Sequence, residues 1–347
     1  MNLRMIEMVV PRETAREAHE QLEDKNTVGT WTYNLEDGSA LLRILLDANQ
    51  TEGISDMLSD NYGREEGFRI ILFAVEATLP LPEAEEEEKE AETGEQPPEE
   101  EEPQGPARVS REELYTDVTA GSELTPVYLA MVVLSTLVAG VGLILDDVAT
   151  IIGAMVIAPL LAPNVSLSLA ATLGDVELGW RSFKANAAGL SVSFVTAFLM
   201  GLLFTVDPGS EEMISRTMVN LKHIIIALAA GSAGVLAFTR GVPAAIVGVM
   251  VAVALLPPLV GVGLLLGAGY MQLAVGAAIL TFTNLICINL AGVLTFLAQG
   301  VRPRSWWEEK KAKKASRTAL IVWLVLLAIF TAIIWYWGQF DVEAMIP

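Results

Sequence analysis

The stretch IIGAMVIAPLLAPNVSLSLAATLGD, residues 151–175, decides the fold of this chain. No charged residue occurs in it before its last position, Asp175, and about 20 apolar residues suffice to cross the hydrocarbon core of a bilayer. Two prolines, Pro159 and Pro163, lie inside it. Because proline lacks the backbone N–H and clashes with the carbonyl four residues earlier, we predict an interrupted membrane span.

The same pattern returns later in the chain. Residues 151–174 align without gaps to residues 246–269, and 10 of the 24 positions are identical, with Pro258 at the place of Pro163. We expect Pro257 and Pro258 to interrupt the second copy as well. Paired broken helices at repeat-related positions are typical of transporter binding sites.

The composition indicates a membrane protein with a soluble N-terminal part. Of the 347 residues, 52% are hydrophobic and 18% are charged, whereas a soluble domain has about a quarter of its residues charged. These figures and the net charge of −20 exclude a disordered chain, a basic nucleic-acid binder and an ordinary soluble enzyme. We therefore expect the protein to interact with the lipid bilayer and not with nucleic acid.

Seven segments pass the length and polarity requirements of a membrane span. They are Val127–Leu145, Val148–Thr172, Ala185–Val206, Leu221–Thr239, Val242–Gly267, Met271–Leu297 and Ala319–Trp337. The two copies of the pattern are spans two and five, so each repeat contains three spans. An odd number of spans inverts the second repeat in the membrane, which is the architecture of many secondary transporters.

The expected fold class is a mostly α-helical, polytopic membrane protein of about seven spans with inverted three-span repeats, plus an N-terminal α/β ferredoxin-like domain. The N-terminal order β-α-β-β-α-β, with a hairpin turn at Asp37-Gly38, favours that fold. The expected divisions are 1–80 for this domain, 81–109 for an acidic disordered linker with twelve Glu, 110–125 for an interfacial amphipathic helix, 126–206 and 207–299 for the two repeats, 300–318 for a basic loop, and 319–347 for the seventh span and tail.

Basic residues set the expected orientation. Most of those between the spans lie in the loops after spans two, four and six, while the opposite loops hold Arg216 and Lys222 together with five acidic residues. Cytoplasmic loops carry an excess of Lys and Arg. The loop after span six alone has seven: Arg302, Arg304, Lys310, Lys311, Lys313, Lys314 and Arg317. We expect a cytoplasmic N-terminus and a C-terminus on the outside.

The candidate site residues lie at and after the breaks. Neutral amides and hydroxyls coordinate small ions or polar solutes, and they equally hold membrane helices together at about 1 kcal/mol each. The candidates for substrate binding are Pro159, Pro163, Asn164, Ser166, Ser168, Pro257, Pro258 and Asn284. The candidates for gating or for a cavity mouth are Asp175, Arg181 and Asn186.

The sequence lacks the motifs of several kinds of pump, enzyme and metal site. No Asp, Glu, Lys or Arg lies deep in a span, which argues against a proton pump with buried carboxylates. There is no phosphate-binding GxxxxGK[ST] loop. Two His and one Cys supply no multi-ligand metal site and no convincing nucleophilic triad. We expect no enzyme activity, no metal and no cofactor.

The run IIGAMVIAPLLAP at residues 151–163, continuing to Gly174-Asp175, resembles the hallmark of a prokaryotic membrane family, the domain of unknown function 389. The resemblance covers about residues 122–299, and Arg181 and Gly189 are consistent with its pattern. Some members are similar to this chain in having a small N-terminal α/β domain. The second copy departs from the motif, with Ala254 at the place of Pro159. The resemblance implies a bacterial or archaeal inner membrane and implies no activity.

The function expected from these patterns is the transport of a small solute or ion between the second and fifth spans. The N-terminal domain would gate transport or assemble subunits into a homo-oligomer. Two alternatives stay open: an ion channel gated by that domain, lined by spans three and six, and a membrane scaffold or sensor that transports nothing.

Overall fold

The computed structural model describes residues 3–75 except 24, 26 and 66, and residues 111–240, 244–303 and 306–337. For residues 112, 244–253 and 306–309 it describes the backbone alone. The chain forms two compact units, Met1–Glu113 and Leu114–Pro347. The acidic linker lies outside the described residues.

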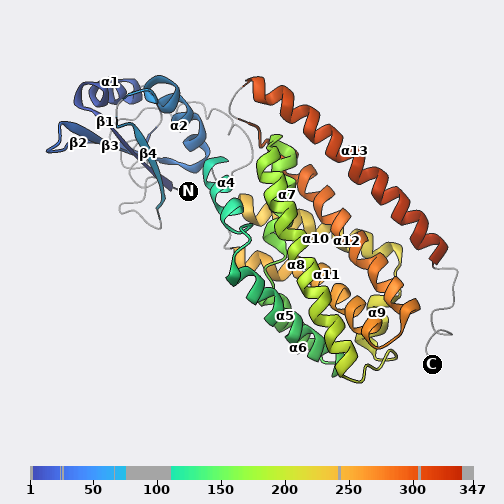
Figure 1. The fold of residues 1–347 in the computed structure, drawn as a ribbon. Coiled ribbons are helices and arrows are strands. Elements are labelled where there is room, and N and C mark those ends of the chain that lie inside the picture. The colour runs from blue at the N-terminus through green and yellow to red at the C-terminus, as the bar shows by residue number, and fades with distance from the viewer. Residues whose placement is uncertain are drawn as a thin grey trace, which may run out of the picture. The chain divides into compact units, whose positions relative to one another are not determined.

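The N-terminal unit has the element order that the sequence predicts. Its elements are β1 Leu3–Pro11, α1 Arg12–Glu23, β2 Gly29–Asn34, β3 Ser39–Asp47, α2 Ala48–Tyr62 and β4 Arg69–Ala74 (Figure 1). The sheet has the order β2-β3-β1-β4, and every neighbouring pair is antiparallel. This is the β-α-β-β-α-β arrangement of the split fold. Gly38 has a φ of +91°, as the tight turn between β2 and β3 requires.

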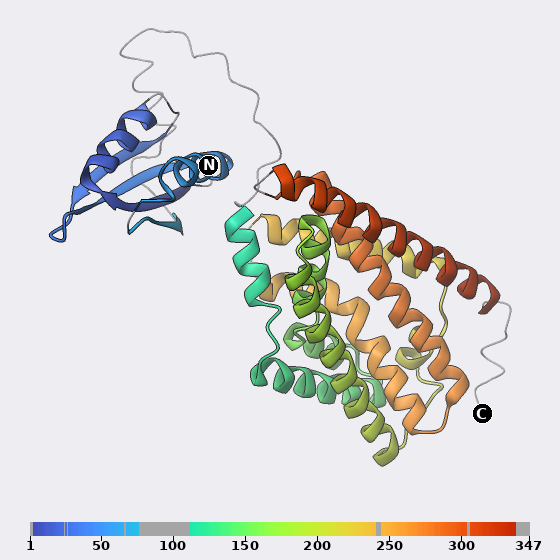
Figure 2. The same cartoon turned by 45° about the horizontal axis from the view of Figure 1, so that its top comes forward.

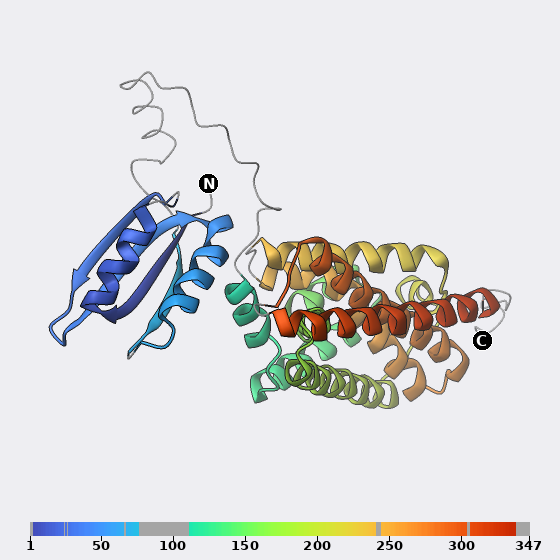
Figure 3. The ribbon, with the colours of Figure 1, turned by 90° about the horizontal axis from the view of Figure 1, so that it is seen from above.

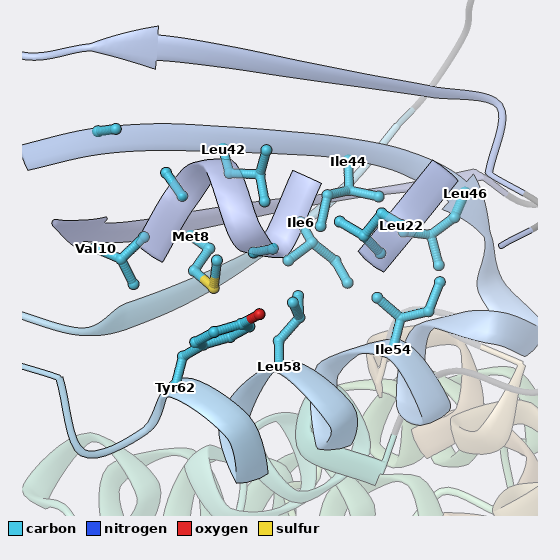
Figure 4. Close-up of a cluster of buried hydrophobic side chains, with 13 residues drawn as sticks. Ile6, Met8, Val10, Leu22, Leu42, Ile44, Leu46, Ile54, Leu58 and Tyr62 are labelled. Carbon is cyan, nitrogen blue, oxygen red and sulfur yellow. The ribbon is translucent and has the colours of Figure 1, made fainter. Parts of the chain in front are cut away.

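The core of this unit lies between one face of the sheet and the two helices. Alternate residues of β1, among them Ile6 and Met8, point inward and are fully buried. Figure 4 shows Leu58 and Tyr62 of α2 pointing at these β1 side chains. Each fully buried aliphatic side chain contributes about 1.5–3 kcal/mol to folding. The core therefore explains why this short segment folds as a unit.

The second unit is a helical bundle (Figures 1 and 2). Its helices are α4 Arg111–Ala120, which begins in the first unit, α5 Pro126–Ile144, α6 Val148–Ile157, α7 Leu161–Leu173, α8 Val176–Leu203, α9 Glu211–Thr217, α10 Leu221–Thr239, α11 Ala244–Gly267, α12 Met271–Ala298 and α13 Trp306–Trp337. Capping side chains determine where several of these helices begin. Thr125, Asp147, Asp175 and Asn220 each accept a hydrogen bond from a backbone N–H in the first turn of the helix that follows.

Among the described residues, five helices are long and apolar enough to cross a membrane: α5, α8, α10, α12 and α13. The pair α6–α7 passes as a sixth span that is bent by 51°. α11 has 24 residues, with side chains described from Ala254 onward. The protein is thus a helical protein of the multi-pass membrane type, and the count of seven spans stays a prediction.

The prediction of two broken spans is correct for the second span and wrong for the fifth. The second span breaks between Ile157 and Leu161, at Pro159. α11, in contrast, is one continuous helix that includes Pro257 and Pro258. A hydrogen bond from Asn284 of α12 to the carbonyl of Ala254 compensates for one of the two prolines.

The two halves of the bundle share a spacing of 95 residues. α5 and α10 both have 19 residues, and α8 and α12 both have 28. Their first residues are 126 and 221, and 176 and 271, so both pairs begin 95 residues apart. Gly174 ends α7 with a φ of +70°, and Gly269 follows α11 with a φ of +90°. Such left-handed residues are the usual way to end a helix, and glycine adopts them without strain.

Small residues bring α8 and α11 into backbone contact. A Cβ atom built on Gly263 would lie 2.5 Å from the Cβ of Ala197, and one on Gly267 would lie 2.3 Å from the carbonyl oxygen of Phe198. Gly201 fits equally closely against the carbonyl oxygen of Leu264, at 2.3 Å. Close packing of this kind drives helix association in lipid, where the hydrophobic effect is absent.

α13 lies along the outside of the bundle in all three views (Figures 1, 2 and 3). Only 6% of its most apolar window is buried. Most of its surface is therefore available to lipid, and its contacts with α7 and α12 hold it to the bundle.

Candidate functional site

The break in the second span is enclosed by protein. Ala158 and Leu160 are 5% and 0% exposed, and Pro159 between them is half-buried. The ψ of Ala158 is 119°, so the backbone leaves the helical conformation there. The last carbonyls of α6 and the first N–H groups of α7 have no helical partners at such an end. Pro163 is the third residue of α7, where its missing N–H costs no helical bond.

An amide cluster lies directly after this break. The Nδ2 of Asn186 on α8 donates to the Oδ1 of Asn164 on α7 at 2.7 Å. The Nδ2 of Asn289 on α12 donates to the same oxygen at 2.9 Å. Asn164 in turn donates to the carbonyl of Leu160 at the break, at 2.8 Å. Three helices therefore meet at one amide oxygen, and all three amides are at most 5% exposed.

Hydroxyl groups extend this cluster along α7. The Oγ of Ser168 donates to the backbone carbonyl of Asn164 at 3.1 Å and lies 3.4 Å from the Oδ1 of Asn289. Two residues before Ser168, and so on another side of α7, Ser166 accepts a hydrogen bond from Ser182 of α8 at 2.7 Å. Ser166, Ser168 and Ser182 are at most 2% exposed. Polar groups of α7 therefore lie at its contact with α8, through Ser166, and at its contact with α12, through Ser168.

Asn284 compensates for one of the two prolines inside α11. Pro258 has no N–H, so the carbonyl of Ala254, four residues earlier, loses its helical donor. The Nδ2 of Asn284 on α12 donates to this carbonyl at 2.6 Å. The other amide atom, Oδ1, is buried and has no hydrogen-bond partner in the described part of the chain. Asn284 therefore replaces the helical bond that is lost at Pro258, one of the two prolines, and leaves one buried acceptor unused.

The predicted mouth residues lie in two places. Asp175 caps α8 by accepting from the N–H of Leu178 at 3.0 Å, and it accepts from the hydroxyl of Tyr115 at 2.9 Å. Burial first, and then the hydrogen bond to Asp175, raise the pKa of Tyr115 above its ordinary value. Arg181 forms an exposed ion pair with Glu123. Asn186, which the sequence groups with these two, lies in the amide cluster instead.

Hydrogen bonds join Asn164 to the break at Leu160, and Ser168 to Asn164, whereas Asn284 bonds to Ala254 in α11. The other candidates lie in the same helices: Ser166 in α7, and Pro257 and Pro258 in α11. Sequence reasoning did not select Asn289 or Ser182 as site residues. One signal was available for Asn289: an amide in an apolar helix has four hydrogen-bonding positions to satisfy, so it requires polar neighbours. The hydroxyl of Ser182 bonds within its own helix as well, to the carbonyl of Leu178, and gives no such signal.

Comparison with known proteins gives the family. A model of the family described as Domain of unknown function (DUF389) matches residues 155–290. An uncharacterized protein of Methanocaldococcus jannaschii is 36% identical over 338 residues, which cover 97% of this chain and all of that protein. The chain belongs to the DUF389 family. The DUF389 match runs from α6 into α12 and contains the break and all three amides of the cluster. No solved structure matches this DUF389 protein.

Proposed function

We propose that this DUF389 protein is an inner-membrane transporter that moves a small solute or ion past the break in its second span. The observation that carries the proposal is the amide cluster of Asn164, Asn186 and Asn289, buried beside an unwound segment. Unwound backbone at membrane depth is tolerated where it lies inside protein or lines a cavity, and transporters use it to bind substrate.

The repeated spacing of 95 residues supports an inverted-repeat architecture. Three spans in each half place the halves in opposite orientations, as in many secondary transporters. The basic loops after spans two, four and six support a cytoplasmic N-terminus and an outside C-terminus. The proposal keeps the second span as the site and assigns no break to the fifth.

The chemistry of the cluster favours a small ion or a polar solute. Amide oxygens, serine hydroxyls and free carbonyls offer neutral oxygen ligands, while the amide nitrogens offer donors. In this conformation the amides bond to one another, so a bound solute would replace these bonds with its own. No side chain that ionises near neutral pH contributes to the cluster, so we propose that transport needs no proton uptake by the cluster itself.

One observation favours the alternative of a scaffold or sensor. Each amide of the cluster already has a hydrogen-bond partner on another helix. Such bonds hold helices together without any ligand. The two functions differ in whether an added solute stabilises the protein and crosses the membrane.

The N-terminal unit is proposed to assemble subunits of a homo-oligomer or to gate transport. Support for assembly comes from the outer face of its sheet, where Trp31, Tyr33 and Phe73 are 43%, 48% and 46% exposed. Exposed apolar groups gathered on one face are characteristic of interaction surfaces. The mass of the purified protein in detergent, with and without residues 1–113, tests this assignment.

The experiment combines thermal unfolding with flux. A panel of ions and polar metabolites is screened for stabilisation of the purified protein, and each positive solute is tested for uptake into proteoliposomes against protein-free liposomes. Asn164→Leu removes the central amide and introduces the residue found at the aligned position, Leu259. Thr136→Val is the matched control, because it removes a buried hydrogen bond between α5 and α8, to Ser193 at 2.8 Å, away from the cluster.

We expect saturable uptake that Asn164→Leu abolishes and Thr136→Val preserves. Single-channel currents would favour the ion channel instead. The proposal fails if no solute stabilises the protein or enters faster than in protein-free liposomes, or if Asn164→Leu transports like the wild type.

A further inference from the structure

A cavity of about 400 Å³ lies where the ends of α7 and α12 meet α13. Its size is within the range of small-molecule sites. Five polar or charged side chains and five apolar ones line it: Thr172, Arg302, Lys313, Ser316 and Arg317, and Leu297, Val301, Pro303, Ala312 and Leu320. Among the described residues, the lining contains three basic groups and no carboxylate. It includes none of the three amides of the cluster, and the proposed transport does not use it.

Two local structures hold the cavity in shape. After α12, Gly300 takes a φ of +70°, and the N–H of Val301 donates back to the carbonyl of Phe296 at 3.0 Å. This helix end buries Val301 and places Arg302 next to the cavity. The opposite wall is α13, where the Oγ of Ser316 donates to the carbonyls of Ala171 and Thr172 at 3.2 and 3.1 Å.

Two arginines, Arg302 and Arg317, supply most of the positive charge of the cavity. Within the part of the chain that the structure describes, no acidic side chain pairs with Arg302 or Arg317. Lys313 adds a third positive charge to the lining. Like charges gathered around one cavity repel each other, and a bound anion relieves that repulsion. Arginine also matches phosphate with two parallel hydrogen bonds.

We propose that this cavity binds a phosphate group, and that an anionic phospholipid supplies it. The apolar wall favours a lipid over a free phosphate. Leu320 lines the cavity, and the next turn of α13 continues with Ile321 and Leu324, which are 52% and 53% exposed on the lipid-facing helix. Basic pockets between spans recognise lipid head groups in this way. The lipid would bridge α13 to the ends of α7 and α12.

The test is thermal unfolding of the full-length protein in detergent. The additions are dioleoylphosphatidylglycerol, dioleoylphosphatidylcholine, and sodium phosphate against sodium chloride at equal ionic strength. The cavity variant is Arg302→Gln with Arg317→Gln. The matched control is Lys311→Gln with Lys314→Gln, which removes the same charge from exposed positions of α13 outside the cavity lining. Arg302→Lys with Arg317→Lys keeps the charge and serves if the Gln variant does not fold.

We expect phosphatidylglycerol to stabilise the wild type and the control more than phosphatidylcholine does. The cavity variant should need about tenfold more phosphatidylglycerol, or more, for the same shift, because it loses charge-assisted hydrogen bonds. The Lys variant should fall between them. Stabilisation by sodium phosphate but not by phosphatidylglycerol would keep the phosphate chemistry and overturn the lipid as its source. Equal losses in cavity and control variants, or no lipid preference in the wild type, would overturn the site.

Discussion

The contact between Asn284 and the proline-interrupted helix gives a double-mutant test. Asn284→Leu keeps the side-chain volume and removes the donor to the carbonyl of Ala254, which Pro258 leaves without a helical partner. A buried carbonyl left unpaired costs about 1–3 kcal/mol. Hydrogen bonds between membrane helices measure about 0.6 kcal/mol on average and reach about 1.7. We expect Asn284→Leu to cost about 1–2 kcal/mol.

Pro258→Ala supplies the missing N–H, so the carbonyl of Ala254 regains a donor from its own helix. In the Pro258→Ala background, Asn284→Leu should lower the free energy of unfolding only slightly. The substitution also removes the unpaired, buried Oδ1, and this offsets part of the stability that is lost with the hydrogen bond. The coupling energy between the two positions should therefore be about 1–2 kcal/mol. We expect the double variant to be at least as stable as the wild type.

The assay is reversible unfolding of the four proteins in mixed detergent micelles, followed by circular dichroism. Asn289→Leu is the matched control, because it removes a buried amide from the same helix that bonds to Asn164 rather than to α11. Asn289→Leu should lower the free energy of unfolding by the same amount with and without Pro258→Ala. An Asn284→Leu cost that is equal in both backgrounds would refute the reasoning.

Two further predictions rest on packing and on titration. Gly201→Ala should cost about 1–3 kcal/mol, since the new Cβ would lie 2.3 Å from the carbonyl oxygen of Leu264. Gly153→Ala, with no heavy atom within 4 Å of its Cβ, should be neutral or stabilising by up to about 1 kcal/mol; equal melting temperatures for the two variants would contradict the close packing. The raised pKa of Tyr115 favours its neutral form in the folded protein, so this contribution to stability is present below the ordinary pKa of tyrosine and is lost as the pH rises through the raised pKa. Asp175→Asn should lower the pKa of Tyr115 only part of the way to the ordinary value, because burial remains the larger cause. An ultraviolet titration, with Tyr115→Phe as the reference, measures this pKa. An unchanged pKa would exclude the contact between Tyr115 and Asp175.

The sequence predicted those features that depend on local patterns. Apolar runs of sufficient length placed the helices, and the proline at position 159 placed the break in the second span. The order β-α-β-β-α-β and the Asp37-Gly38 turn predicted the N-terminal sheet. In each case the residues that determine the structure lie within a few positions of it, so the pattern itself contains the information.

The sequence failed where a distant residue decides the outcome. Pro257 and Pro258 indicate a break, yet α11 is continuous. Asn284, 26 residues after Pro258, supplies the hydrogen bond that is lost at Pro258. The partner of an amide on another helix depends on how the helices rotate and pack, and no local pattern gives that rotation. For the same reason Asn186 was expected at a cavity mouth, whereas it faces Asn164 on a neighbouring helix.

The close backbone contact between α8 and α11, at Gly201, Gly263 and Gly267, limits which parts of this protein are able to move. Its glycines leave no layer of side chains between the two backbones, so there are no rotamers to readjust if one helix slides along the other. Shear between packed helices depends on such small readjustments. The two helices should therefore travel together as a single rigid frame. Any rearrangement that opens a path across the bilayer would have to take place outside this pair of helices. It would involve the second span, which is broken at Pro159, and the helices that flank it.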